Sequence, residues 1–410
     1  MPIKNVIMHF GMPKTGSSSI QHTLFHNSEI LEKNSFRYLT EWELNHARKL
    51  YHIFKSGTVR PINDRYWGKP ISKIQHDNNI KKLTDKMQQV INTASSETLV
   101  LSGECFEVFR SPASIEILKN FISKYFKNKS INVKIVLLVR NPLPWVISSL
   151  QQQISRCRFL RSVDFFDDRM LHYEAVGNLI KNFPELMTLI KFEDACLDKD
   201  GLVGYFLKKI GFPEKNIHQL EIKRVNESRC MEAMEFINFI ESIEPLSLHS
   251  DFETMNPNRS ITDLSCTGRI KGIKFDLPHQ SKVELWERLQ ETALLLKKNT
   301  GIDYTDYVLP PSATSIEPEI WNEETIHGFI EVFPQLSPVI QRLFLKFFEM
   351  KYAETAQEKF KLLYFKGSVP WEMYNSKNTF LTLSIFHIKN RLPKFMPAVI
   401  KKQLKRLLAK

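Results

Sequence analysis

Short apolar runs alternate with longer amphipathic stretches through the first half of the chain. Between Val6 and Gly211 the short runs are rich in β-branched residues, which is typical of parallel strands buried on both faces. The longer stretches repeat apolar residues with the period of an α-helix. This pattern predicts strands at 6–10, 98–102, 133–139 and 187–192. It predicts helices at 17–33, 79–93, 113–127, 142–155, 174–182, 202–210, 231–243 and 281–298. The alternation favours an α/β fold, a three-layer sandwich with a mostly parallel sheet flanked by helices.

The pattern changes near residue 310, where Pro, Ser, Thr and isolated acidic residues interrupt the periodicity. We expect a domain at 1–305, a linker at 306–320 and a helical extension at 321–410. Helical patterns within the extension cover 323–333 and 338–365. The final stretch, 374–410, holds nine Lys or Arg and no acidic residue. Within it, apolar residues at helical spacing over 398–408 leave four cations on the other side, which predicts a basic amphipathic helix.

Composition narrows the class of protein. The chain has 410 residues, 42% of them hydrophobic, and a formal net charge of +12, which excludes a wholly disordered or fibrous protein. No apolar run approaches the roughly 18 residues of a membrane span, and strand-like residues begin where a signal sequence would have its basic and apolar regions. We therefore expect a cytoplasmic protein. The five cysteines are widely spaced without CxxC pairs, so we interpret them as free thiols rather than a disulfide framework or zinc site.

A glycine-containing loop follows the first predicted strand and precedes the first predicted helix. Its sequence is Gly11-Met-Pro-Lys-Thr-Gly16-Ser-Ser-Ser19. Backbone N–H groups and a helix N-terminus in this setting form a cradle for an anion. A Walker A loop places Lys directly after the second Gly, whereas here that position is Ser17 and Lys14 lies inside the loop. We expect Ser17 or Ser18 to cap the helix and bind anion oxygens, with Lys14 projecting toward the far end of the anion.

A second strand-to-helix junction carries Arg140 and, farther along the predicted helix, Ser148. Ligands of open α/β sheets bind at the carboxyl ends of the strands, where Arg140 is expected. The pair predicts a phosphate site if the helix packs alongside the ligand. The alternative is an Arg140 in an ordinary surface ion pair and a Ser148 that faces solvent.

These two elements together resemble the 5′-phosphosulfate loop and the 3′-phosphate motif of sulfotransferases that use 3′-phosphoadenosine 5′-phosphosulfate. The stretch Leu189-Ile-Lys-Phe-Glu-Asp194, with the helical 202–211 after it, resembles a strand, acidic pair and helix of the same family. Asn226-Glu-Ser228 resembles its bacterial members. The run from Lys14 to Gln21, together with Asn45-His46, is similar to bacterial enzymes that sulfate saccharides or cell-surface polymers. The resemblance covers about 1–305 and leaves the tail unmatched.

The resemblance implies the cofactor 3′-phosphoadenosine 5′-phosphosulfate, the product adenosine 3′,5′-bisphosphate and no metal. It implies that Lys14 supports the leaving bridging oxygen and that Arg140 with Ser148 binds the 3′-phosphate. Arg269, within Gly268-Arg-Ile-Lys-Gly272, is the candidate for a late basic loop over that phosphate. It implies that the 5′-phosphosulfate is held by Gly11, Lys14, Thr15, Gly16, Ser17, Ser18 and Ser19.

Transfer to a hydroxyl needs a general base near its proton. Glu104 follows a predicted strand and should point into the same crevice as the loop, where the family places a His or Glu. The alternative is a carboxylate that caps the next helix or pairs with a Lys. His46 is a second candidate, in a polar and aromatic segment that would form the acceptor wall, with an ordinary surface His as its alternative.

The acceptor implied by the resemblance is a hydroxyl of a saccharide, a cell-surface glycan or a glycolipid. The basic tail predicts either peripheral contact with the anionic inner face of a membrane or a helix packed on its own domain. Nucleic acid is not expected as a partner, because the charge is concentrated in the tail without a recognition motif. A P-loop kinase is the alternative function, although it would need Lys after Gly16 and a magnesium-binding carboxylate. The oligomeric state is left open.

Overall fold

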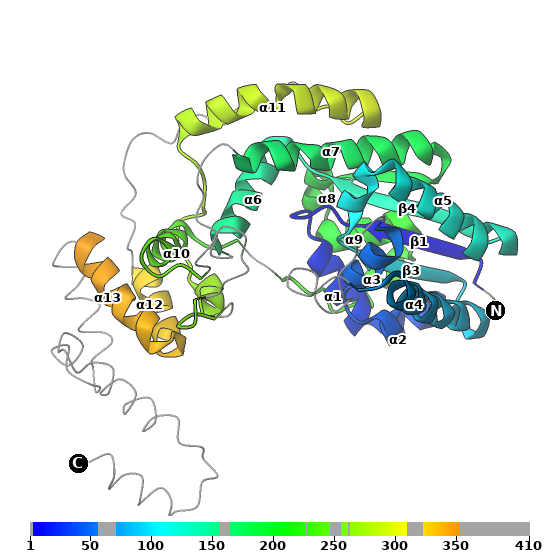
Figure 1. Cartoon of the computed structure of the whole chain (residues 1–410), viewed down its shortest axis with the longest axis horizontal. Coiled ribbons are helices and arrows are strands. Elements are labelled where there is room, and N and C mark those ends of the chain that lie inside the picture. Colours follow the sequence, from blue (N-terminus) through cyan, green and yellow to red (C-terminus); the bar gives the residue numbers. More distant parts are fainter. Residues whose placement is uncertain are drawn as a thin grey trace, which may run out of the picture. The chain divides into compact units, whose positions relative to one another are not determined.

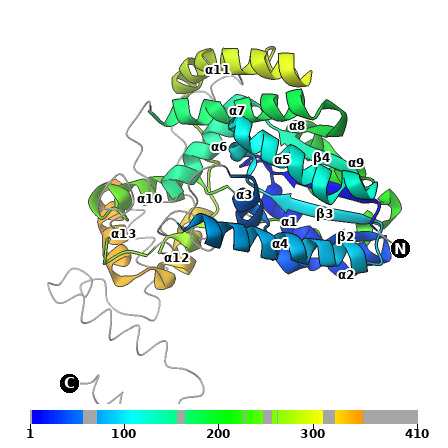
Figure 2. The ribbon, with the colours of Figure 1, turned by 45° about the vertical axis from the view of Figure 1, so that its right-hand side comes forward.

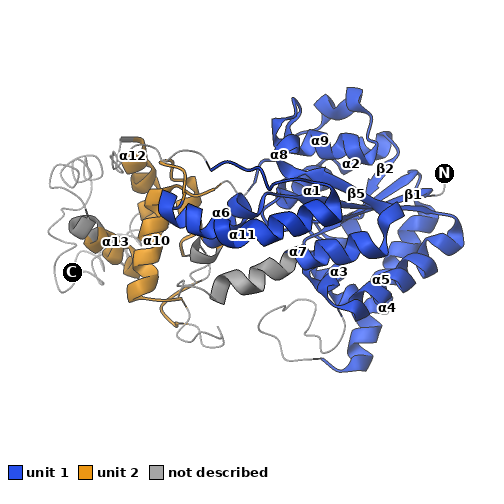
Figure 3. Cartoon of the chain, turned by 90° about the horizontal axis from the view of Figure 1, so that it is seen from above, with its two compact units in different colours: residues 1–150, 161–227, 277–314 blue, residues 151–160, 228–276, 315–410 orange. Residues whose placement is uncertain are grey.

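The structure, a computed structural model, describes residues 3–55, 71–155, 164–225, 228–246, 256–260, 263–309 and 323–351. The chain divides into two compact units (Figure 3). Unit 1 comprises Met1–Leu150, Arg161–Glu227 and Leu277–Thr314, and unit 2 comprises Gln151–Leu160, Ser228–Asp276 and Ser315–Lys410. Residues 310–320 of the linker expected at 306–320, and the basic helix expected at 398–408, lie outside the described residues.

Unit 1 contains a parallel sheet, and within the described residues its strands lie in the order β2-β3-β1-β4-β5. Figure 1 shows the central strands β3, β1 and β4. All four pairings are parallel, with Ile7 opposite Val100 of one neighbour and Lys134 of the other. The four predicted strands are confirmed, and the three-residue β2 was not predicted. The strands are β1 (Asn5–Phe10), β2 (Phe36–Tyr38), β3 (Thr98–Gly103), β4 (Asn132–Val139) and β5 (Met187–Lys191).

Helices cover both faces of this sheet, which confirms the predicted α/β class. The α-helices described for unit 1, with α6 continuing into unit 2, are α1 (Ser17–His26), α2 (Ser28–Lys33), α3 (Ala47–Phe54), α4 (Lys73–Thr93), α5 (Pro112–Tyr125), α6 (Pro142–Ser155), α7 (Asp164–Asn182), α8 (Phe192–Leu197), α9 (Gly201–Ile210) and α11 (His279–Thr300). Helix α11 runs alongside α7 in Figures 1 and 2.

Alternate residues of each strand face opposite layers, as the strand period of two requires. On one face Ile7, Val100 and Val136 pack in a single buried cluster with apolar residues of α1 and α9. On the other face Phe10 contacts Phe54 of α3 and Phe109, with ring centroids 5.8 and 4.8 Å apart. The sheet is therefore the middle layer of three. Its faces are covered by helices, and the loops that connect strands to helices lie at the ends of the strands.

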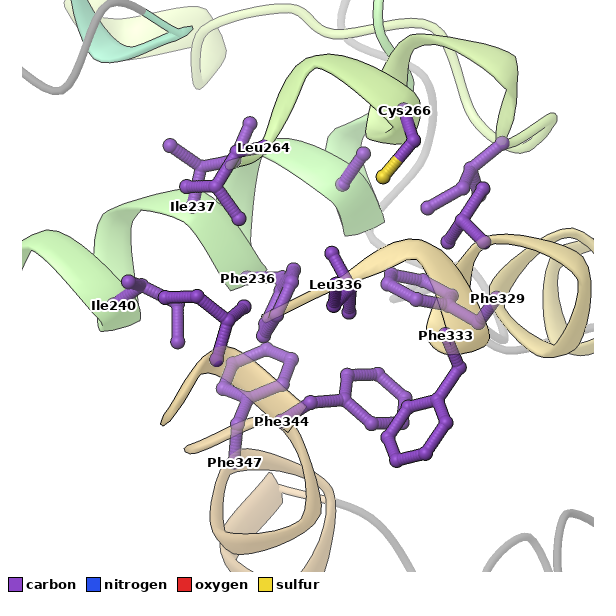
Figure 4. Packing of buried hydrophobic residues seen from close by; sticks show 14 of the residues in the cluster. Phe236, Ile237, Ile240, Leu264, Cys266, Phe329, Phe333, Leu336, Phe344 and Phe347 are labelled. Atoms are coloured by element: carbon purple, nitrogen blue, oxygen red, sulfur yellow. The ribbon is translucent and has the colours of Figure 1, made fainter. Parts of the chain in front are cut away.

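Unit 2 is helical in its described part and has its own core. Its helices are α10 (Met231–Ile243), α12 (Glu323–Val332) and α13 (Pro338–Lys351). Phe236 of α10 meets Phe329 of α12 and Phe344 of α13, with ring centroids 5.8 and 5.2 Å apart (Figure 4). The segment 228–276, which the sequence pattern assigned to the first domain, therefore clusters with the C-terminal extension, because the apolar face of α10 is covered by α12 and α13.

None of the helices in the described ranges combines the length and the low charge that a membrane-crossing helix needs.

Candidate anion-binding site

The loop between β1 and α1 is tight at both of its glycines. A Cβ on Gly11 would lie 2.2 Å from Oγ of Ser17, so only glycine lets the end of β1 pass the start of the helix. Gly16 has φ 76°, in the left-handed region, and a Cβ there would lie 2.0 Å from Cδ2 of Leu202. Both glycines are therefore required by the shape of the loop.

Two side chains from the β4–α6 junction hold carbonyls of this loop. Arg140 Nη1 donates to the carbonyl of Lys14 (2.7 Å), and Trp145 Nε1 donates to the carbonyl of Pro13 (2.7 Å). Lys14 itself has φ 64°, an uncommon backbone conformation for a residue with a side chain. Because N–H and C=O point in opposite directions across a trans peptide, the amides of Lys14 and Thr15 point away from these two donors.

The hydroxyl groups of the loop do not cap α1. Its N-cap is Gly16, which makes no side-chain capping hydrogen bond, so the predicted cap by Ser17 or Ser18 is wrong. Thr15 is buried, and its hydroxyl donates to the carbonyl of Met12 (2.6 Å); the buried Ser17 hydroxyl makes a longer bond to the same oxygen (3.5 Å). Ser19 Oγ accepts from the amide of Val225 (3.3 Å), and Ser18 is half-buried. The first amides of α1 have no acceptor within the helix, so they are available as donors to an anion.

Arg140 lies at the carboxyl end of β4, as predicted. Its guanidinium lies over the ring of Phe192, 4.7 Å from the centroid, and burial lowers its pKa while Glu193 opposes that shift. Among the described residues its buried Nε has no hydrogen-bond partner. Ser148 is half-buried on α6. The roles of Arg140 and Ser148 in phosphate binding stay a prediction, but the first of them is beside the loop.

Glu104 follows the last residue of β3 and lies beside the loop. A Cβ on Gly11 would come within 3.2 Å of Cγ of Glu104, and the side chain is half-buried. The parallel order of β3 and β1 brings their carboxyl ends together, which is the relationship that the sequence predicted.

His46 has a different environment from the acceptor wall that was expected. It is buried, its Nδ1 accepts from the amide of Ser102 (3.0 Å), and its ring stacks on Tyr38 with centroids 4.6 Å apart. Burial lowers its pKa to about 3. Instead of facing solvent or an acceptor, His46 packs in the core, and this surrounding argues against a general-base role.

A second buried histidine was missed by the sequence analysis. His9, near the end of β1, is within 2.8 Å of Oγ of Ser102 through its Nδ1, and burial lowers its pKa to about 3. Its place in an apolar strand gives no signal of function, and its environment is that of a neutral core residue.

Arg269 lies in unit 2, in the short helix Ser265–Arg269, where its guanidinium donates to Oε1 of Gln335. Its part in cofactor binding stays a prediction.

No group of three or more His, Cys, Asp or Glu able to ligate a metal ion occurs in the part of the chain that the structure describes.

The sequence matches no family model and no curated protein. Among solved structures, the chain is similar to a sulfotransferase from Alicyclobacillus acidocaldarius, with a TM-score of 0.33 and 13% identity over 54% of this chain and 85% of that one. It is also similar to retinol dehydratase in complex with androsterone and the inactive cofactor PAP, with a TM-score of 0.29 and 14% identity over 76% of this chain and 84% of that one. Both TM-scores are low, so the fold and the site rest on this chain's own geometry.

Proposed function

We propose that this protein is a sulfotransferase that moves a sulfuryl group from 3′-phosphoadenosine 5′-phosphosulfate to a hydroxyl group. The observation that carries the proposal is the loop after β1, where Lys14 lies inside an anion cradle and Glu104 lies at its edge. The loop sequence resembles the 5′-phosphosulfate loop of that family, and Arg140 lies next to it.

Sulfuryl transfer, like phosphoryl transfer, is served by in-line positioning and by stabilisation of the charge that develops on the leaving oxygen. In the proposal, Lys14 stabilises the bridging oxygen as the sulfur–oxygen bond to the phosphate breaks. Glu104 takes the proton of the acceptor hydroxyl as the new sulfur–oxygen bond forms. Adenosine 3′,5′-bisphosphate is the leaving group of the transfer. Arg140 and Ser148 bind its 3′-phosphate during this step.

The acceptor in this proposal is a saccharide, or a cell-surface glycan or glycolipid, in accord with the bacterial members that the sequence resembles. Contact of the basic residues at 374–410 with an anionic membrane surface would bring the enzyme to a lipid-linked acceptor. The test measures transfer of radioactive sulfate from labelled 3′-phosphoadenosine 5′-phosphosulfate to two kinds of acceptor. These are soluble oligosaccharides and glycolipids in vesicles that contain or lack anionic lipid.

A P-loop kinase is the competing function. The loop carries Ser17 where a Walker A loop has Lys, which favours the sulfotransferase. A kinase would bind ATP with magnesium, whereas the sulfotransferase would bind adenosine 3′,5′-bisphosphate without it.

The deciding experiment is calorimetric titration of adenosine 3′,5′-bisphosphate, and separately of ATP, into the wild type and Lys14→Ala, each with and without magnesium. We expect magnesium-independent binding of the bisphosphate by both proteins. With 3′-phosphoadenosine 5′-phosphosulfate and an acceptor, we expect Lys14→Ala to lose about 100-fold or more in turnover. If the protein binds ATP only in the presence of magnesium and does not bind the bisphosphate, the kinase function replaces this proposal.

A further inference from the structure

Glu193 connects the end of β4 to the start of α8. It is the second residue of α8, directly after Phe192, whose ring lies under the guanidinium of Arg140. Its Oε1 accepts a hydrogen bond from the backbone amide of Asn141 (2.9 Å). The carboxylate therefore holds the peptide that immediately follows Arg140.

The other carboxylate oxygen of Glu193 is held by Tyr304. The hydroxyl of Tyr304 lies 2.8 Å from Oε2 of Glu193 and 3.1 Å from the carbonyl of Val139, the last residue of β4. Tyr304 is buried, and burial together with Glu193 raises the pKa of its hydroxyl, so it remains a donor. This side chain comes from the segment after α11 and returns to the strand end within unit 1.

The backbone of Arg140 is fixed from the opposite side as well. The hydroxyl of Tyr173 donates to the carbonyl of Arg140 (3.2 Å), while Glu193 holds the next amide. Arg140 is thus held at its carbonyl by Tyr173 and at its guanidinium by Lys14 and Phe192. A charge-assisted hydrogen bond from a backbone amide to a carboxylate is stronger than a neutral one. Of the hydrogen bonds that hold the Arg140–Asn141 peptide, the one to Glu193 should therefore contribute most.

We infer that Glu193 and Tyr304 are positioning residues for the anion site: they hold the Arg140–Asn141 peptide, and through Arg140 the Lys14 carbonyl, in the geometry that binds the cofactor. Neither residue is assigned to touch the anion. The inference deepens the proposed function, on which its cofactor readout rests, while the effect on the peptide itself is independent of any ligand.

The first measurement is hydrogen exchange by mass spectrometry on the ligand-free full chain, following peptides that contain Asn141. We compare Glu193→Ala, Glu193→Gln, Tyr304→Phe and the control Tyr307→Phe, whose ring packs on Trp286 with centroids 5.4 Å apart. Exchange is expected to be about tenfold faster or more in Glu193→Ala and intermediate in Tyr304→Phe. Glu193→Gln keeps an acceptor for Asn141 but loses the charge, so its exchange should lie between wild type and Glu193→Ala. Tyr307→Phe should stay close to wild type.

The second measurement uses the cofactor. For Tyr304→Phe we expect about five- to tenfold weaker binding of adenosine 3′,5′-bisphosphate and a KM for 3′-phosphoadenosine 5′-phosphosulfate raised by the same factor. The kcat should change less than about threefold, since the groups proposed to react are untouched.

Unchanged exchange at Asn141 in both Glu193→Ala and Tyr304→Phe, in proteins that keep the wild-type circular dichroism, would overturn the inference. So would an equal effect of Tyr307→Phe. If the wild type binds no bisphosphate but the exchange ranking holds, the proposed function fails and the positioning of the peptide stands.

Discussion

Arg140 donates a hydrogen bond to the backbone carbonyl of Lys14, a residue 126 positions earlier in the chain, over a distance of 2.7 Å. The cation at the end of β4 thereby shapes the loop after β1. Lys14 keeps its left-handed conformation with this bond on one side and the Trp145 bond to Pro13 beside it. Hydrogen bonds thus join the two strand ends, and a substitution at one should alter the conformation of the other.

Arg140→Lys tests this relationship, because it keeps the charge but loses the planar fork. The guanidinium of Arg140 donates to the Lys14 carbonyl and lies over the ring of Phe192 at the same time. The smaller ammonium group of a lysine can make only one of these two contacts. We expect the dissociation constant of adenosine 3′,5′-bisphosphate to rise about tenfold or more by calorimetry. The exposed Arg110 provides the control, Arg110→Lys. Equal affinities in Arg140→Lys and wild type would contradict the coupling.

Gly16→Ala combines two costs that can be separated. At Gly201, with φ 65° and nothing within 4 Å of an added Cβ, alanine meets only the backbone strain, about 1 kcal/mol. At Gly16 the added Cβ also meets Leu202 at 2.0 Å. Because the atom met is the end of a flexible, half-buried side chain, we expect Gly16→Ala to lower the free energy of unfolding by about 1 kcal/mol more than Gly201→Ala in urea denaturation.

The double variant Gly16→Ala/Leu202→Ala serves as the internal control. Removing the Leu202 side chain should bring the alanine at position 16 close to the pure strain cost, measured relative to Leu202→Ala alone. If the cost of Gly16→Ala is the same with and without Leu202, close packing at this glycine is not the cause.

Glu104→Gln separates chemistry from binding. The amide keeps the size of the side chain beside Gly11 but cannot take up the acceptor's proton. We expect turnover to fall about 100-fold or more, with the affinity for adenosine 3′,5′-bisphosphate changed less than about threefold. Glu107→Gln, on the short helix that follows, is the control. Wild-type turnover in Glu104→Gln would remove this carboxylate from the mechanism.

The buried histidines predict how stability depends on pH. Burial lowers the pKa of His9 and of His46 from 6.5 to about 3, so both stay neutral in the folded chain. Below about pH 6.5 the unfolded chain binds protons that the folded chain does not, and the free energy of unfolding falls until about pH 3. Between pH 7 and 5.5 the two residues together should remove about 2.5 kcal/mol.

Urea denaturation at a series of pH values measures this loss. His46→Gln should remove about half of the decrease between pH 7 and 5.5, whereas the exposed His218 offers a control, His218→Gln, that should leave it in place. A wild-type stability that is flat over this range would show that these two histidines are protonated in the folded protein.

The strands and the loop of the site were predictable because their signals are local. The run of β-branched residues at β1, followed by Gly11 and Gly16, carries its meaning within a few positions, and so does the arginine after β4. β2 was missed because three residues are too short to show a period. Burial of His46 was missed because nothing in its own segment shows that the Ser102 amide meets its ring.

The contacts around Glu193 were not predictable for a different reason. Tyr304 lies 111 positions away and follows a helix, so no spacing rule joins it to an acidic residue after β5. The assignment of 228–276 failed to anticipate unit 2 for a similar reason, since the apolar face of α10 does not reveal which helices cover it. The sequence pattern identifies the apolar face of a helix, whereas only the tertiary contacts show which elements cover that face.

The route of the chain through the two units has a consequence for how the protein is made and dissected. Unit 1 is assembled from three stretches, and the last of them, 277–314, supplies both α11 and Tyr304 only after 228–276 has been synthesised. A nascent chain ending before residue 277 would expose the side of α7 that α11 covers, so the sheet unit matures late on the ribosome. No single cut releases either unit intact, and a minimal sheet fragment would have to rejoin 150 to 161 and 227 to 277 through designed linkers.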